Sequence, residues 1–232
     1  MTDVLTLEQV DDDGAIRETM AAAAGDTRAA FLAKAGLFGG GLFGSAALLG
    51  LMADGAAAQS RGDVAILNFA LTLEYLEAAF YTEAEKKGAL KGELALFARV
   101  VGAHERAHVK ALRDVLGRRA VKRPRFDFHG TTERVSAFKA TAQALEDTGV
   151  AAYKGQAPRI DSDAVLRAAL AIHSVEARHA AWIRDINGKP PAPAAFDKPQ
   201  TMTQILATVA QTRFIVPARR TTRRRRSPRF TG

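Results

Sequence analysis

The 232-residue sequence contains no cysteine, and only 7% of its residues are aromatic. The absence of Cys excludes disulfide frameworks, thiol catalysis and Cys-based zinc or iron-sulfur sites, and it is neutral about cellular compartment. Alternating β-branched runs are also few, whereas Ala and Leu are abundant. This combination favours an all-α protein, and the length fits one domain with extensions.

Positive charge is concentrated at the end of the chain. The net charge is +8, yet residues 1–58 hold three Lys or Arg against eight Asp or Glu. Seven Arg lie within residues 218–232, which we predict to be a disordered tail. Such a tail can contact anionic polymers or lipid weakly through charge. Because the excess lies in the tail, it does not predict a sequence-specific nucleic-acid surface.

Residues 1–58 have the character of a leader. An acidic stretch is followed by Arg28 and Lys34, an apolar run over residues 35–53, and three Ala ending at Ala58, a position suited to cleavage. The arrangement resembles a twin-arginine export signal in which Ala29 replaces one Arg. It predicts an exported protein, periplasmic or at the cell surface. The apolar run nearly reaches the roughly 20 residues that span a bilayer, so a membrane anchor and an Ala/Gly linker stay open as alternatives.

Residues 59–217 show four long helical patterns and a short one. Glycines or an Asn-Gly pair follow the long patterns and predict their ends. We predict helices at about residues 61–87, 93–116, 131–154, 163–186 and 202–211, with Thr131 or Thr132 capping the third and the last packing across one end of the bundle.

Connection lengths predict the topology. The first and third links are short, which makes each helix pair an antiparallel hairpin. The second link has about fifteen residues, which reach about 50 Å when extended, whereas a helix of about 25 residues is about 37 Å long. It can therefore return along the bundle. We predict an all-α four-helix bundle of two antiparallel hairpins joined by a long crossover, with a short C-terminal helix.

Two Glu-x-x-His motifs interrupt apolar helical patterns, one at Glu105 and His108 and the other at Glu176 and His179. Residues three apart on a helix point the same way. Each pair shares its face with apolar side chains, so it should point into a core. A buried carboxylate needs compensation, which a bound metal or an ion-pair network can provide.

The motifs belong to an internal repeat with an offset of 71 or 72 residues. In each half, a Glu and a Tyr seven residues later precede the Glu-x-x-His motif by about thirty residues. The matched residues are Glu74 with Glu146, Tyr81 with Tyr153, Glu105 with Glu176, and His108 with His179.

This pattern resembles the ferritin-like superfamily, in which four-helix bundles hold two metals by one Glu from each of two helices and Glu-x-x-His from each of the others. The segment LTLEYLEAAFY, residues 71–81, further resembles exported bacterial ferritin-like domain proteins of the desiccation-related type. The resemblance implies that Glu105 and Glu176 bridge or chelate both metals. It also implies one metal each for Glu74 and Glu146, and one nitrogen ligand each from His108 and His179.

Oxygen and imidazole ligands suit two Fe or two Mn ions. The resemblance therefore implies a di-metal carboxylate protein, most simply di-iron, that reacts with oxygen or peroxide as a ferroxidase-like or manganese-catalase-like oxidoreductase. A non-catalytic, stress-associated metal-binding or structural bundle is the alternative, and a homo-oligomer is left open. Tyr81 and Tyr153 are expected to donate hydrogen bonds to ligands on opposite helices, or else to be core residues.

A rival interpretation starts from His104, because residues 104–108 match the H-E-x-x-H motif of zinc metalloproteases. It leaves the second Glu-x-x-His motif without a role, which makes it a remote alternative. Under the di-metal interpretation His104 lies behind the ligands or at the surface, and His173 is an ordinary half-buried residue. Glu77, one turn from Glu74, could replace it as ligand, and only the repeat favours Glu74.

Overall fold

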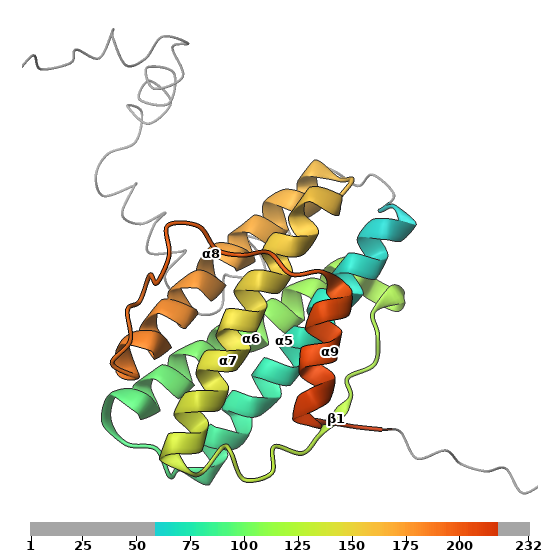
Figure 1. Ribbon diagram of the computed structural model, residues 1–232. Helices are drawn as coiled ribbons and strands as arrows, with labels where there is room; N and C mark the ends of the chain where they lie inside the picture. Colours follow the sequence, from blue (N-terminus) through green and yellow to red (C-terminus); the bar gives the residue numbers. More distant parts are fainter. Residues whose placement is uncertain (1–58, 218–232) are drawn as a thin grey trace, which may run out of the picture. The chain divides into compact units, whose positions relative to one another are not determined.

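The computed structural model describes residues 59–217 (Figure 1). The predicted leader, residues 1–58, and the predicted Arg-rich tail, residues 218–232, lie outside the described residues. Within residues 59–217 the chain is mostly helical and confirms the predicted bundle. Its long helices are α5 (Arg61–Lys87), α6 (Gly92–Leu116), α7 (Val135–Gln156) and α8 (Asp163–Ile186), and a shorter helix, α9 (Met202–Thr212), follows.

The long helices form two hairpins, as predicted. α5 packs most extensively with α6, and α7 with α8. Residues 117–134 connect the hairpins and run the length of the bundle, so that α6 and α7 are parallel (Figure 1). This crossover contains a 3-10 turn, η1 (Gly117–Arg119), and a short strand, β1 (Arg125–Phe126). Each half of the sequence repeat is therefore one hairpin.

A two-stranded antiparallel sheet, which the sequence did not predict, joins the crossover to the end of the domain. β1 pairs with β2 (Ile215–Val216), and Phe126 lies opposite Ile215. The Asp127 N–H donates to the carbonyl of Phe214 over 2.9 Å, and the rings of Phe128 and Phe214 meet edge to face with centroids 5.3 Å apart. The chain after α8 is thereby held to the bundle.

The predicted start of α7 was wrong by about three residues. The helix begins at Val135 rather than after Thr131 or Thr132. Both hydroxyl groups have other partners, because Thr131 donates to the carbonyl of Phe128 over 2.8 Å and Thr132 to Glu83 of α5 over 2.7 Å. A tertiary contact with α5 thus replaces the expected helix cap.

The predicted end of α7 was also wrong, because the helix passes through Gly155 to Gln156 and continues as a 3-10 turn, η2 (Ala157–Arg159). A Cβ atom at Gly155 would lie only 1.8 Å from the carbonyl oxygen of Gln200. The Gln200 N–H also donates to the carbonyl of Ala151 over 3.1 Å. Gly155 therefore permits the Pro-rich segment to cross α7 closely, and it does not end the helix.

Helix α9 follows that segment and begins with a capping box formed by Thr201 and Gln204. Ile205 and Val209 are buried against the apolar core. The helix contacts α7, and Figure 1 shows it running beside α7 rather than across an end of the bundle as predicted.

The core contains two apolar clusters, one with Tyr81 and the other with Tyr153. α5 contributes to both. Among the described residues it is the one helix long and apolar enough to cross a membrane, but 72% of its most apolar window is buried in the bundle. That burial is expected of the central helix of a packed core.

Asp63 fastens the start of α5 to the start of α8. Its side chain is fully buried, and its two carboxylate oxygens accept hydrogen bonds from the N–H groups of Asp161 and Ser162 over 2.9 and 3.1 Å. The Ser60 hydroxyl in turn accepts from the Asp63 N–H over 2.9 Å. The two helices are therefore tied at the same end of the bundle.

Replacing Asp63 with Ala should lower the free energy of unfolding by about 1 to 2 kcal/mol, because the partly buried N–H groups of Asp161 and Ser162 lose their acceptor. Chemical denaturation followed by circular dichroism measures the change. The exposed Asp185 serves as control, and Asp185→Ala should change stability by less than about 0.5 kcal/mol. Equal effects of the two substitutions would contradict the role of Asp63.

Candidate metal centre

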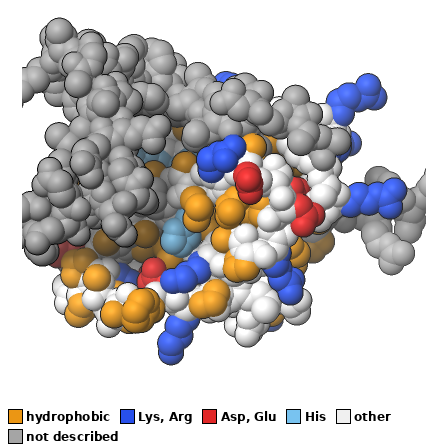
Figure 2. All heavy atoms as spheres, turned by 90° about the horizontal axis from the view of Figure 1, so that it is seen from above, with side chains coloured by type: hydrophobic (Ala, Val, Ile, Leu, Met, Phe, Trp, Pro, Cys, Tyr) orange, Lys and Arg blue, Asp and Glu red, His pale blue; other side chains and the backbone are white. Residues whose placement is uncertain are grey.

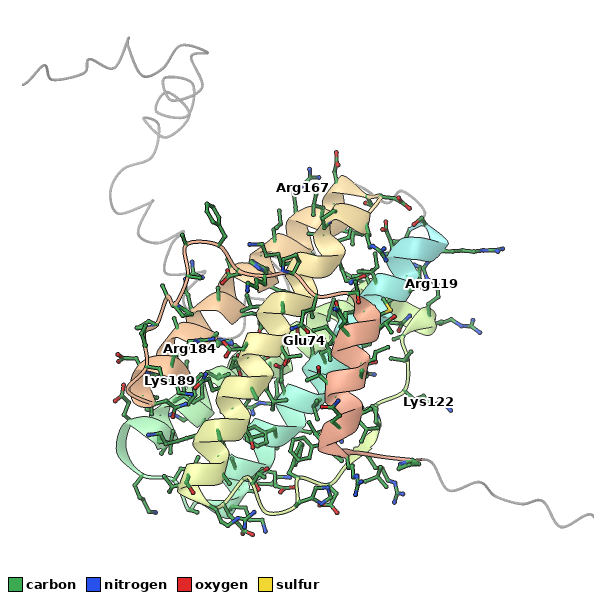
Figure 3. All side chains as sticks on the ribbon, in the orientation of Figure 1. Glu74, Arg119, Lys122, Arg167, Arg184 and Lys189 are labelled. Atoms are coloured by element: carbon green, nitrogen blue, oxygen red, sulfur yellow. The ribbon has the colours of Figure 1, made fainter. Side chains whose placement is uncertain are left out.

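The six predicted ligand residues come from all four long helices and meet inside the bundle. α5 supplies Glu74, α6 supplies Glu105 and His108, α7 supplies Glu146, and α8 supplies Glu176 and His179. Figure 3 labels Glu74 between the helices. The side chains of all four glutamates have a relative exposure of 0%, so the helical periodicity has directed four acidic groups into the core.

These residues form two overlapping groups, and within each group the potential ligand atoms lie within 4.8 Å of one another. We name them the first and second positions. Glu105 and Glu176 belong to both. The first position consists of Glu74, Glu105, His108 and Glu176, and the second consists of Glu105, Glu146, Glu176 and His179.

The two shared carboxylates each direct one oxygen to either position. Glu105 Oε2 lies 3.3 Å from His108 Nδ1, and its Oε1 lies 3.1 Å from His179 Nδ1. Glu176 Oε1 lies 3.2 Å from His108 Nδ1, and its Oε2 lies 3.9 Å from His179 Nδ1. Carboxylates placed in this way could contribute a ligand to each of two cations.

The other two carboxylates each face one position and are held by a tyrosine from the opposite hairpin. The Tyr153 hydroxyl donates to Glu74 Oε1 over 2.5 Å, and Glu74 Oε2 lies 3.2 Å from His108 Nδ1. The Tyr81 hydroxyl likewise donates to Glu146 Oε1, and Glu146 Oε2 lies 3.2 Å from His179 Nδ1. Each tyrosine therefore leaves the second oxygen of its carboxylate directed at a metal position.

Several buried polar atoms of the cluster have no hydrogen-bond partner. They are Glu105 Oε1, Glu146 Oε2, both carboxylate oxygens of Glu176, and His179 Nδ1. All of them belong to residues of the second position. Unpaired buried acceptors are costly, and cations at the two positions would satisfy them. The donor set therefore fits a divalent metal.

The cluster holds protons when no metal balances its charge. Burial raises the pKa of Glu74 well above its usual value and that of Glu146 to about 8. Burial alone would lower the pKa of His108 and of His179, but the surrounding carboxylates raise both well above the ordinary value. Burial would also raise the pKa of Glu105, yet the adjacent His108 and His179 hold it well below its usual range.

His104 supports the second position from outside. Its Nδ1 lies 2.9 Å from His179 Nε2, and the two rings stack with centroids 5.1 Å apart. His104 is exposed, and Figure 2 shows histidine side chains reaching the surface among apolar ones. The contact orients His179 so that its Nδ1 faces the carboxylates. His104 belongs to neither metal group, which gives the H-E-x-x-H interpretation no geometric support.

Two further residues lie beside the cluster. His173 is half-buried, as expected, and its Nε2 has no hydrogen-bond partner. Glu77 is buried but lies outside both groups. The sequence singled out Glu77 only as a substitute for Glu74, whereas the structure buries both.

Comparison with known proteins identifies the fold family. A family model described as a ferritin-like domain matches residues 62–189. The match includes all six residues of the two positions and almost all of the four long helices. A comparison with curated proteins finds no match.

Metal binding should release protons, because groups that hold protons in the metal-free cluster must lose them to become ligands. Because the pKa values of Glu74, Glu146 and the two histidines are raised, these groups lose their protons only as the pH rises. At higher pH the metal therefore has fewer protons to displace. We therefore expect the affinity for Mn(II) to increase from pH 6 to pH 8. Calorimetric titration in buffers of different ionisation enthalpy measures the release. An affinity independent of both pH and buffer would contradict it.

Proposed function

This chain belongs to the ferritin-like domain family, and from that premise we propose that its buried cluster binds two Fe or two Mn ions and reacts with oxygen or peroxide. The observation that carries the proposal is the pair of overlapping positions that share Glu105 and Glu176. Four ionised carboxylates and two neutral imidazoles balance the charge of two divalent cations. Such hard ligands suit Fe(II) and Mn(II).

The residues of the chain have separate roles in this proposal. Glu105 and Glu176 would each contribute a ligand at both positions, and Tyr81 and Tyr153 fix the carboxylates of Glu146 and Glu74. The surrounding apolar clusters keep bulk water from the site. When bound, two Fe(II) or Mn(II) ions would each give up one electron, so that one oxygen or peroxide molecule would be reduced by two electrons.

A metal site that turns over no substrate is the second candidate. The observation that favours it is the complete burial of all four carboxylates, because structural metal sites are closed whereas catalytic ones keep an open position. In this case the metals would hold the two hairpins together in a stress-associated or structural protein. Consumption of oxygen or peroxide distinguishes the two candidates.

We expect the purified protein to contain two metals per chain and to consume oxygen when Fe(II) is added. Glu105→Ala and Glu176→Ala should each lose most of both metals, since each residue contributes to both positions, and oxygen uptake should fall with them. Elemental analysis and an oxygen electrode give the two readouts.

The control is Glu133→Ala, which removes a surface carboxylate paired with Lys87 and should leave metal content and oxygen uptake unchanged. Wild-type protein without two metals would contradict the di-metal proposal. Two bound metals without consumption of oxygen or peroxide would instead establish the non-catalytic candidate.

We further propose that the protein is exported, on the sequence pattern of residues 28–58. N-terminal sequencing of protein recovered from outside the cytoplasm should find a chain that begins near Gln59. A chain that still begins at Met1 would contradict cleavage and favour the membrane-anchor alternative at residues 35–53.

A further inference from the structure

The internal repeat is broken at one place inside the core. The offset of 72 residues that relates Glu74 to Glu146 also relates Glu77 to Gly149. Glu77 is 3% exposed, and Gly149 is also buried. One half of the repeat thus has an additional buried carboxylate where the other half has no side chain.

Gly149 lies between the carboxylates of Glu77 and Glu176. A Cβ atom at Gly149 would lie 3.5 Å from Glu77 Oε1 and 3.1 Å from Glu176 Oε2. Glu176 Oε2 is the oxygen directed to the second position. The Glu77 carboxylate therefore lies beside the second position, although it starts from the same helix as Glu74, which serves the first.

No cation or hydrogen-bond donor of the described residues compensates the Glu77 carboxylate. None of the hydrogen bonds or ion pairs within residues 59–217 involves its side chain, and its neighbours across Gly149 are acidic. Burial raises its pKa well above the ordinary value, and Glu176 and Glu146 add more to that rise than Glu105 and Glu74 do. A carboxylate in such surroundings gains most from a nearby metal.

A second break in the repeat flanks the same position. The offset of 71 residues that relates His108 to His179 also relates His104 to Val175. His104 contacts His179, a ligand residue of the second position. Glu77 and His104, two polar departures from the repeat, therefore both lie beside the second position.

We propose that Glu77 is an additional carboxylate ligand of the second position and makes the two metal positions unequal, so that the second position fills first. This inference rests on the proposed function. Because Glu77 lies outside the 4.8 Å group, it joins the metal by turning its side chain past Gly149 towards Glu176. A side chain at position 149 would lie between Glu77 and Glu176 and would press on Glu176 Oε2.

Anaerobic calorimetric titration with Mn(II) tests the proposal. Wild-type protein should bind two ions in two steps of unequal affinity. Glu77→Gln keeps the side-chain shape and removes the charge, and it should weaken the tighter step about 10- to 100-fold, the range seen when groups that support a metal are lost. Glu74→Gln is the matched control on the same helix and should weaken the looser step instead.

Thermal unfolding of the metal-free proteins separates ligation from a structural role. Because Gln is neutral and nearly the same size, metal-free Glu77→Gln should be at least as stable as wild type and should gain less stability on adding Mn(II). Gly149→Ala provides a second variant with Glu77 intact, and its methyl group should also weaken the tighter step.

The possible failures are distinguishable. Wild-type protein that binds no metal would overturn both the proposed function and this inference. Wild-type protein that binds two ions with equal affinity, or with two steps that Glu77→Gln leaves unchanged, would overturn the inference alone.

Discussion

The structure depends on the burial of four ionisable carboxylates in one layer of a helical bundle. Burying Glu74, Glu105, Glu146 and Glu176 without compensation would favour opening of the bundle. Within the bundle, two tyrosine hydroxyls and two imidazoles lie next to these carboxylates and partly compensate their burial. Most of the cluster atoms that remain unpaired are directed at the second position, and Glu176 Oε1 is directed at the first. The same residues therefore have to be packed in the core and to serve the proposed metal binding.

Helical periodicity made the centre of the molecule predictable. Glu105 and His108 lie on one face because they are three residues apart, and the repeat then placed Glu176 and His179 in the corresponding position of the other hairpin. Short links fixed which helices are antiparallel. The shared helical faces and the hairpins depend on residues that are close together in the sequence, and the ligand pattern occurs twice. Both kinds of signal can be read from one sequence.

Features that depend on a particular distant partner were not predictable in this way. Thr132 is a good helix cap by composition, but its hydroxyl contacts Glu83 on another helix. Gly155 is a good helix terminator, but its backbone lies against Gln200. The role of Gly149 is likewise visible only when Glu77 and Glu176 are seen around it. In each case the residue type suits a local role, such as a helix cap or a helix end, but the residue instead makes room for or contacts a distant part of the chain. The sequence alone does not distinguish these two roles.

Neither hairpin contains a complete metal position. The first position takes Glu176 from the second hairpin, and the second position takes Glu105 from the first. Two copies of a single hairpin, related by a twofold axis, could supply the same ligands as a symmetric dimer. The crossover of residues 117–134 joins the two halves covalently, so that a substitution changes one half without changing the other. Because both hairpins are in one chain, one of the two positions can change while the other is kept, which is impossible in a dimer of identical chains.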